Sequence, residues 1–312
     1  MATAYTETPD NYSEIEESVI TDISEIKSIF FNSNKVLFYD ACSFQRHSNL
    51  KENEKNILLC YFENHAVAIF LTRCVLMELS GDHHSLERQY VEYINELKDS
   101  RVKIVLFNEE YTYNILSDCF STIERINEYL MWAVRMAKTP ISTITDTLNA
   151  DSKLKSEVIE GKNLRASDLY RRFFLKVRGN KEHEDNLGEE LISICVHILS
   201  NLPGMPNGKI CVLTDDKGAA SIINSVLRKT NPQKRGSKPI LFSTPKLVQF
   251  MYQEQVELSE NEIVNILSQG VSDNIVIMGI TPFDFEVNNK ISLSCRELAK
   301  KIMEPNGINI VF

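Results

Sequence analysis

The chain has 312 residues, of which 34 are Lys or Arg and 43 are Asp or Glu, and its formal net charge is −9. With 43% apolar and 25% charged residues it can bury a sizeable core, which excludes wholesale disorder. The acidic balance argues against nonspecific coating of nucleic acid, although a local basic surface remains open. No apolar run approaches the ~20 residues of a membrane span, and no basic-then-apolar leader opens the chain. We therefore expect a cytoplasmic protein without a membrane segment.

The first third of the chain alternates predicted helices and strands. Residues 1–18 are polar and acidic, and we expect them to form a flexible tail. The apolar period of 19–30 predicts a helix, and the apolar run 36–39 predicts a buried strand that ends at Asp40. Four further elements follow in chain order: a helix at 53–65, an apolar segment at 66–81 that carries Glu78, a helix at 84–99 and a strand at 101–110.

The same alternation returns after a long helical stretch. Residues 110–180 have a helical pattern, and an apolar stripe from Leu187 predicts the next helix. The segment 209–216 again reads as a strand followed by acids. Strands that alternate with helices of about 10–15 residues predict a mostly parallel sheet, so the fold class is α/β. Residues 256–312 are predicted to add an α/β extension.

Acidic side chains stand where two of the predicted strands end. Because the carboxyl ends of parallel strands converge on one crevice, we expect acids placed there to meet. Clustered carboxylates repel one another unless a cation neutralises them, and an all-carboxylate site without histidine suits Mg²⁺ or Mn²⁺. The candidate metal ligands are Asp40, Glu78, Glu189 (or its neighbour Glu190), Asp215 and Asp216.

Each acid also has a plain structural alternative. Asp40 is placed to cap the helix that follows it, and Glu189 fits a capping box with Asn186. Asp215 or Asp216 could cap a helix that starts directly after them. Glu78 is the hardest to explain in this way because its neighbours are mostly apolar. The ordered set favours a shared site over separate caps.

Five segments in chain order carry a family resemblance: the strand ending in Asp40, VLMELS with Glu78, NLGEELISICVHI, VLTDDKGAA and LFSTPKLVQFM. Together they resemble a PIN domain, the metal-dependent nuclease superfamily, over about 36–107 and 184–254. The resemblance implies a Rossmann-like three-layer domain over 19–255 with a central parallel sheet. Within it, about 110–180 would be the helical insertion, and 256–312 would be a C-terminal extension packed on the domain.

The resemblance also implies roles for individual residues. Asp40, Glu78, Glu189 and Asp216 would be catalytic, and these four with Asp215 would bind Mg²⁺ or Mn²⁺. The family often has Ser, Thr or Asn two residues after the first Asp, where this chain has Cys42.

The implied activity is hydrolysis of phosphodiester bonds, most directly by an endoribonuclease, with toxin or defence-system effectors among the implied roles. One alternative is a structure-specific DNA nuclease of the same superfamily, and another is a catalytically inactive binding module. A partner protein could bind through the insertion or the extension, and a homo-oligomer is a further expectation.

Two basic clusters flank the predicted site in the sequence. In 162–181 basic residues outnumber acids and alternate with Tyr170, Phe173 and Phe174, and a second cluster lies at 228–238. The more specific interpretation is RNA binding, with the basic groups binding phosphate and the bases stacking on the aromatic rings. A solvated basic helix face over core aromatics is the commoner alternative. The predicted nucleic-acid-binding residues are Arg171, Arg172, Lys176, Arg178, Lys234 and Arg235.

Overall fold

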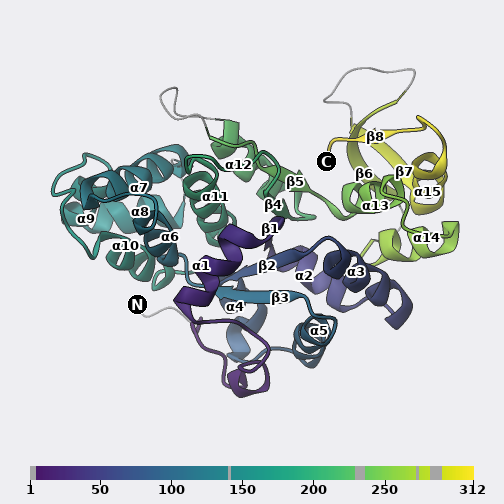
Figure 1. Ribbon diagram of the computed structural model, residues 1–312, viewed down its shortest axis with the longest axis horizontal. Coiled ribbons are helices and arrows are strands. Elements are labelled where there is room, and N and C mark those ends of the chain that lie inside the picture. Colours follow the sequence, from purple (N-terminus) through teal and green to yellow (C-terminus); the bar gives the residue numbers. More distant parts are fainter. Residues whose placement is uncertain (1–4, 140–141, 229–235, 272–273, 282–289) are drawn as a thin grey trace.

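A central parallel sheet organises the molecule, with a group of helices at one end and a small second sheet at the other (Figure 1). The computed structural model describes residues 5–139, 142–228, 236–271, 274–281 and 290–312. Within these residues no helix is both long and apolar enough to cross a membrane. The α/β class predicted from the alternation of strands and helices is confirmed.

The central sheet has five strands in the order β3-β2-β1-β4-β5, and all neighbouring pairs are parallel. Its inner strands are short apolar runs buried on both faces, as a parallel sheet covered by helices requires. The order reverses between β1 and β4, so the first half of the sheet grows to one side and the second half to the other. The strands are β1 (Lys35–Tyr39), β2 (Val67–Thr72), β3 (Lys103–Phe107), β4 (Ile210–Leu213) and β5 (Ile240–Phe242).

Helices cover both faces of this sheet (Figure 1). Right-handed crossovers place α3 and α5 on one face, where they contact β2 and β3, and place α11 and α12 on the other. The helices of this layered part are α1 (Ile23–Asn32), α2 (Ala41–Ser48), α3 (Glu52–Asn64), α4 (Arg73–Ser80), α5 (Arg88–Asp99), α11 (Leu187–Ser200), α12 (Lys217–Arg228) and α13 (Thr244–Gln253).

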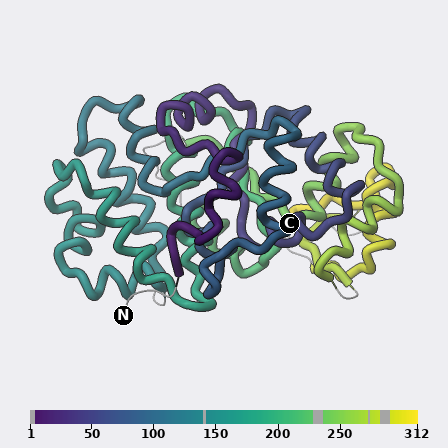
Figure 2. The backbone as a smooth tube through the Cα atoms, turned by 90° about the horizontal axis from the view of Figure 1, so that it is seen from below, coloured from purple at the N-terminus to yellow at the C-terminus, as the bar shows by residue number. Residues whose placement is uncertain are grey.

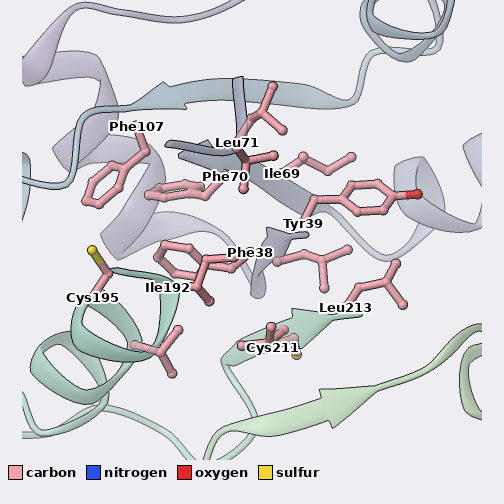
Figure 3. Close-up of a cluster of buried hydrophobic side chains, with 14 of the residues drawn as sticks. Phe38, Tyr39, Ile69, Phe70, Leu71, Phe107, Ile192, Cys195, Cys211 and Leu213 are labelled. Atoms are coloured by element: carbon pink, nitrogen blue, oxygen red, sulfur yellow. The ribbon is translucent and has the colours of Figure 1, made fainter. Parts of the chain in front are cut away.

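Aromatic rings from three adjacent strands build the centre of the core (Figure 3). The ring of Phe38 on β1 lies 5.6 Å from that of Phe70 on β2 and 5.9 Å from that of Phe107 on β3, between centroids. Ile192 and Cys195 of α11 approach the same cluster, and all five side chains are fully buried. This packing fixes the height of α11 against the sheet and hence the position of its first turn.

In the part of the chain between β3 and α11 that the structure describes, all regular structure is helical. Its helices lie within the range predicted for the insertion and form the group at one end of the molecule (Figure 1). Tyr170, Phe173 and Phe174 are buried, so these rings are core and cannot stack on bases. The helices are α6 (Tyr111–Ser117), α7 (Ile123–Ala137), α8 (Thr143–Ala150), α9 (Ser152–Val158) and α10 (Leu169–Arg178).

The C-terminal residues form a small antiparallel sheet with two helices. The burial of β6 alternates along the strand, which is the pattern of a sheet covered on one face only. Its helices α14 and α15 both begin with capping boxes, Ser259 with Glu262 and Ser294 with Glu297. The elements are α14 (Glu260–Ser268), β6 (Asn274–Ile280), β7 (Lys290–Ser294), α15 (Cys295–Met303) and β8 (Asn309–Ile310), with strand order β7-β6-β8.

The described part of the N-terminal segment, residues 5–18, is not the flexible tail predicted from its composition. It packs along the middle of the molecule, where Figure 2 shows it in purple. Pro9 and Ile15 are buried, and the amide of Asp10 donates to the carbonyl of His84 at 2.7 Å. A few well-placed apolar residues and backbone bonds hold this polar segment, and average composition does not detect them.

Arg178, at the end of α10, ties together three parts of the chain. Its guanidinium is 1% exposed and forms ion pairs with Glu109 and Glu110, which follow β3, and with Glu7 of the N-terminal segment. The prediction that Arg178 binds nucleic acid is therefore wrong, because all its charge is directed into the protein. Glu109 is fully buried and also accepts the amide of Cys74 at the start of α4, at 2.9 Å.

We expect Arg178→Met to lower the free energy of unfolding by about 3–5 kcal/mol, because it leaves the buried Glu109 carboxylate without a cation. Urea unfolding followed by circular dichroism measures this change. Arg171→Met, on the exposed side of the same helix, is the matched control and should change stability by no more than about 0.5 kcal/mol. Equal effects of the two substitutions would contradict the assignment.

Candidate metal centre

The site expected from the sequence lies where the strand order reverses, beyond the carboxyl ends of β1 and β4. Asp40 directly follows β1, and its amide donates to the carbonyl of Leu213, the last residue of β4, at 3.0 Å. Thr214, Asp215 and Asp216 follow β4. In open parallel sheets this crevice is the usual place for a ligand.

Asp40 is buried and oriented by two side-chain donors. It is 3% exposed, and its Oδ2 accepts the Thr214 hydroxyl at 2.7 Å and the Cys42 thiol at 2.9 Å. Asp40 occupies the N-cap position of α2 but makes no side-chain capping bond, so capping does not explain it. Burial raises the pKa of its carboxyl, and the nearby charge of Asp216 acts in the same direction.

Asp216 has two roles in this structure. Its Oδ1 accepts the amides of Gly218 and Ala219, so it does cap α12, as the plain alternative proposed. It is exposed, and its charge nevertheless raises the pKa of both Asp40 and Glu189. The capping bonds therefore hold Asp216 in place beside the other acids.

Adjacent acids at the start of α11 have different environments. Burial raises the pKa of Glu189 to about 7, and the charges of Asp40 and Asp216 add to the rise, so Glu189 faces the crevice. Glu190 is 2% exposed and bonds to Ser142 and the backbone at Ile144, beside the insertion, and burial raises its pKa to about 8. This favours Glu189 over Glu190 as the site residue. The capping box with Asn186 is not formed.

Glu78, on α4, is close to the acids but already has a cationic partner. The Nζ of Lys181 lies 3.0 Å from its Oε1. Burial raises the pKa of the Glu78 carboxyl to about 8, Lys181 opposes this, and the charges of Glu189 and Asp40 add to it. In the sequence Lys181 is only the last residue of a basic stretch, and nothing there indicates that it belongs to the site.

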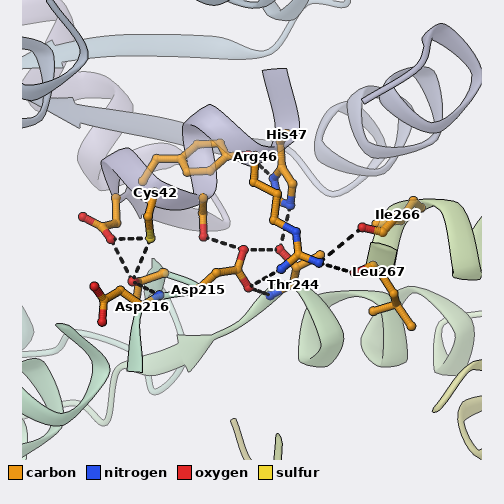
Figure 4. A network of polar contacts seen from close by, with 12 residues as sticks. Cys42, Arg46, His47, Asp215, Asp216, Thr244, Ile266 and Leu267 are labelled. Carbon is orange, nitrogen blue, oxygen red and sulfur yellow. Dashed lines mark hydrogen bonds and ion pairs between the residues drawn. The ribbon is translucent and has the colours of Figure 1, made fainter. Parts of the chain in front are cut away.

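Asp215 bonds to a different set of partners, which lie next to the group of Asp40, Cys42 and Asp216 (Figure 4). Its carboxylate lies 3.4 Å from Arg46, accepts the Ser43 hydroxyl at 2.9 Å, and accepts both the amide and the hydroxyl of Thr244. Burial works against ionisation, but Arg46 and the other donors hold the pKa of Asp215 below its usual value. Because these partners already occupy the oxygens of the Asp215 carboxylate, Asp216 is favoured as the metal ligand.

This network continues to the C-terminal extension and into the core. Arg46 also donates to the carbonyls of Ile266 and Leu267 at the end of α14 (Figure 4). His47 bonds through one ring nitrogen to Thr244, at 2.8 Å, and through the other to Tyr39. Burial lowers the pKa of His47 to about 4, so its ring is neutral near pH 7. The extension is thus fastened to the helix that follows Asp40.

The predicted nucleic-acid-binding residues are in different situations. Arg171 and Lys176 are exposed on α10, where they are available to a ligand. Arg172 pairs with Glu157 at 2.6 Å and with Asp168 at 3.0 Å. Arg178 is buried, as described above. Lys234 and Arg235 lie outside the described residues.

Four acids from four elements thus lie close together: the charge of Asp216 raises the pKa of Asp40 and Glu189, and the charges of Asp40 and Glu189 raise that of Glu78. Their donor set consists only of carboxylate oxygens, which suits a hard divalent cation. Among the residues that the structure describes, no three Asp, Glu, His or Cys side chains already stand in an arrangement that holds a metal ion. Binding an ion here would require the side chains to turn toward it.

The chain matches no protein-family model, no curated protein and no solved structure. Any family assignment therefore depends on the residues and geometry described above.

In EDTA, we expect the protein to become less stable as the pH rises from about 4.5 to about 7. The folded-state pKa of Glu189 is raised from 4.5 to about 7, so the folded protein binds this proton more tightly than the unfolded chain does. Stability from the protonated form is lost as the pH rises through that window. Urea midpoints between about pH 5 and about pH 7.5 measure the effect.

Glu189→Gln should make this pH dependence shallower, whereas Glu182→Gln, at an exposed acid on the preceding loop, should leave it unchanged. An unaltered slope in Glu189→Gln would show that Glu189 does not face the other acids.

Proposed function

We propose that this protein is a metal-dependent phosphodiesterase of PIN type, most directly an endoribonuclease. The observation that supports it best is that Asp40, Glu189 and Asp216 come from three separate elements to the point where the strand order reverses, with Glu78 at the edge of the group. A set of helix caps or surface acids has no reason to converge on one crevice.

The cost of this arrangement is itself an argument for a cation. Burial raises the pKa of the Asp40, Glu78 and Glu189 carboxyls, and the charge of another acid of the group adds to each of these three rises. A bound Mg²⁺ or Mn²⁺ would remove this repulsion and favour the ionised forms. Asp40, Glu189 and Asp216 would hold the ion, and Glu78 would lie beside them, paired with Lys181.

The bound ion would supply activation of water and neutralisation of phosphoryl charge. The chain's own residues prepare its ligands: Thr214 and Cys42 orient Asp40, and the first turn of α12 orients Asp216. Cys42 acts here as a hydrogen-bond donor, at the position where PIN domains often have Ser, Thr or Asn.

RNA is the proposed substrate, with Arg171 and Lys176 as exposed groups available for phosphate. A structure-specific DNA nuclease is the same-fold alternative, and competition between single-stranded RNA and flap DNA separates the two. The alternative of another class is an inactive binding module. A toxin or defence role, with a partner bound through the insertion or extension, follows by analogy with the family.

Asp40→Asn and Asp216→Asn should each reduce Mn²⁺-dependent RNA cleavage at least about 100-fold, because each removes a charged ligand. Cleavage of a labelled RNA measures this. The thermal midpoint of the Asp40 variant in EDTA should be unchanged or higher, since repulsion is relieved. The Asp216 variant retains an oxygen that can cap α12, so it should still fold.

Asp99→Asn is the matched control. Asp99 is exposed and ends α5 just before β3 begins, so it lies at the other end of the strands from the candidate site. This control should cleave like the parent. If either site variant cut RNA as fast as the parent, the assignment would be abandoned, and if the parent cut no nucleic acid with Mn²⁺, the inactive binding module would replace it.

A further inference from the structure

Lys181 is an ammonium group built into the acidic crevice. It is 4% exposed, and its Nζ contacts the Glu78 carboxylate at 3.0 Å, the Asp185 carboxylate, and the carbonyl of Glu182 at 3.4 Å. The ring of Tyr5 covers it, with its centroid 5.3 Å from Nζ. Lys181 is therefore a buried and paired charge within the candidate site, and it is not a solvated surface charge.

Asp185, a carboxylate partner of Lys181, is held in place by further hydrogen bonds. Asp185 accepts the Thr143 hydroxyl at 2.8 Å, the amide of Glu182 at 2.8 Å and the amide of Leu187 at 3.2 Å. Thr143 begins α8 of the insertion and Leu187 begins α11, so two elements hold this carboxylate. The ammonium therefore has a defined position between Asp185 and Glu78.

The Glu78 carboxylate lies directly against the first turn of α11. A Cβ placed on Gly188 would lie 2.6 Å from its Oε1 and 2.7 Å from its Oε2, so the glycine at this position allows the close approach. Glu78 thus lies between Gly188 and Lys181.

We propose that Lys181 takes the place of a second metal ion, so that the site binds one divalent cation through Asp40, Glu189 and Asp216. This inference rests on the proposed function. Two-metal sites place their ions about 3.5–4 Å apart and need carboxylates for both. Here the carboxylates that would serve a second ion, Glu78 and Asp185, are both already paired with the one ammonium. Lys181 is a positioning residue, since it acts through Glu78.

The number of Mn²⁺ ions bound per chain tests this directly. Calorimetric titration with Mn²⁺, checked by the electron paramagnetic resonance signal of the free ion, should give one ion for the parent. Lys181→Met should bind two, because an ion can then bridge Glu78 and Asp185. Lys181→Arg keeps the charge and should bind one. Two ions in the parent, or one in a folded Lys181→Met, would overturn the proposal.

A second measurement does not depend on the folding of Lys181→Met. Glu78→Gln removes a carboxylate that contacts the ammonium, and Glu182→Gln removes an exposed carboxylate on the residue that follows Lys181 in the chain. If Glu78 is not a ligand, their Mn²⁺ affinities should agree within about threefold. If it is, Glu78→Gln should be weaker by about tenfold or more, which would overturn the proposal. A parent that binds no Mn²⁺ would instead refute the metal centre itself.

Discussion

Repulsion between carboxylates at the point where the strand order reverses is the constraint on which the rest of the site depends. Asp40, Glu189 and Asp216 are brought together by the sheet and by α11, and burial together with the charges of neighbouring acids disfavours the ionised forms of Asp40 and Glu189. The surrounding structure compensates through directed donors, the hydroxyl of Thr214, the thiol of Cys42 and the first amides of α12. These donors hold the acids but do not neutralise them, which leaves a place for a cation.

Two buried cations connect the helical insertion to the sheet. Arg178 and Lys181 lie three residues apart, and each enters a group of carboxylates, Arg178 beyond β3 and Lys181 beside α4. The N-terminal segment contributes to both places, with Glu7 bonded to Arg178 and Tyr5 lying over Lys181. The insertion and the N-terminal segment therefore both contribute residues that surround the candidate site. A basic stretch that suggested nucleic-acid contact serves partly as internal charge compensation.

A separate set of hydrogen bonds and an ion pair connects the C-terminal extension to the candidate site. Arg46 joins Asp215 to the carbonyls at the end of α14, while neutral His47 links Thr244 to Tyr39 (Figure 4). Because Arg46 lies on α2, its bonds to α14 attach the extension to the helix that directly follows Asp40. The adjacent acids Asp215 and Asp216 thus differ: Asp215 bonds to other groups within the protein, and Asp216 faces the crevice.

The sequence by itself determined the fold class, the parallel strands and the convergence of acids at strand ends, because apolar period and the rule for parallel sheets act locally or through topology. It could not separate Glu189 from Glu190, since one step along a helix turns a side chain by about 100° and only packing against the insertion shows which acid is buried. It also missed the Lys181–Glu78 pair, because residues a hundred positions apart carry no signal of contact in one chain. Tertiary structure alone decided which charges meet, since that depends on how separate elements pack.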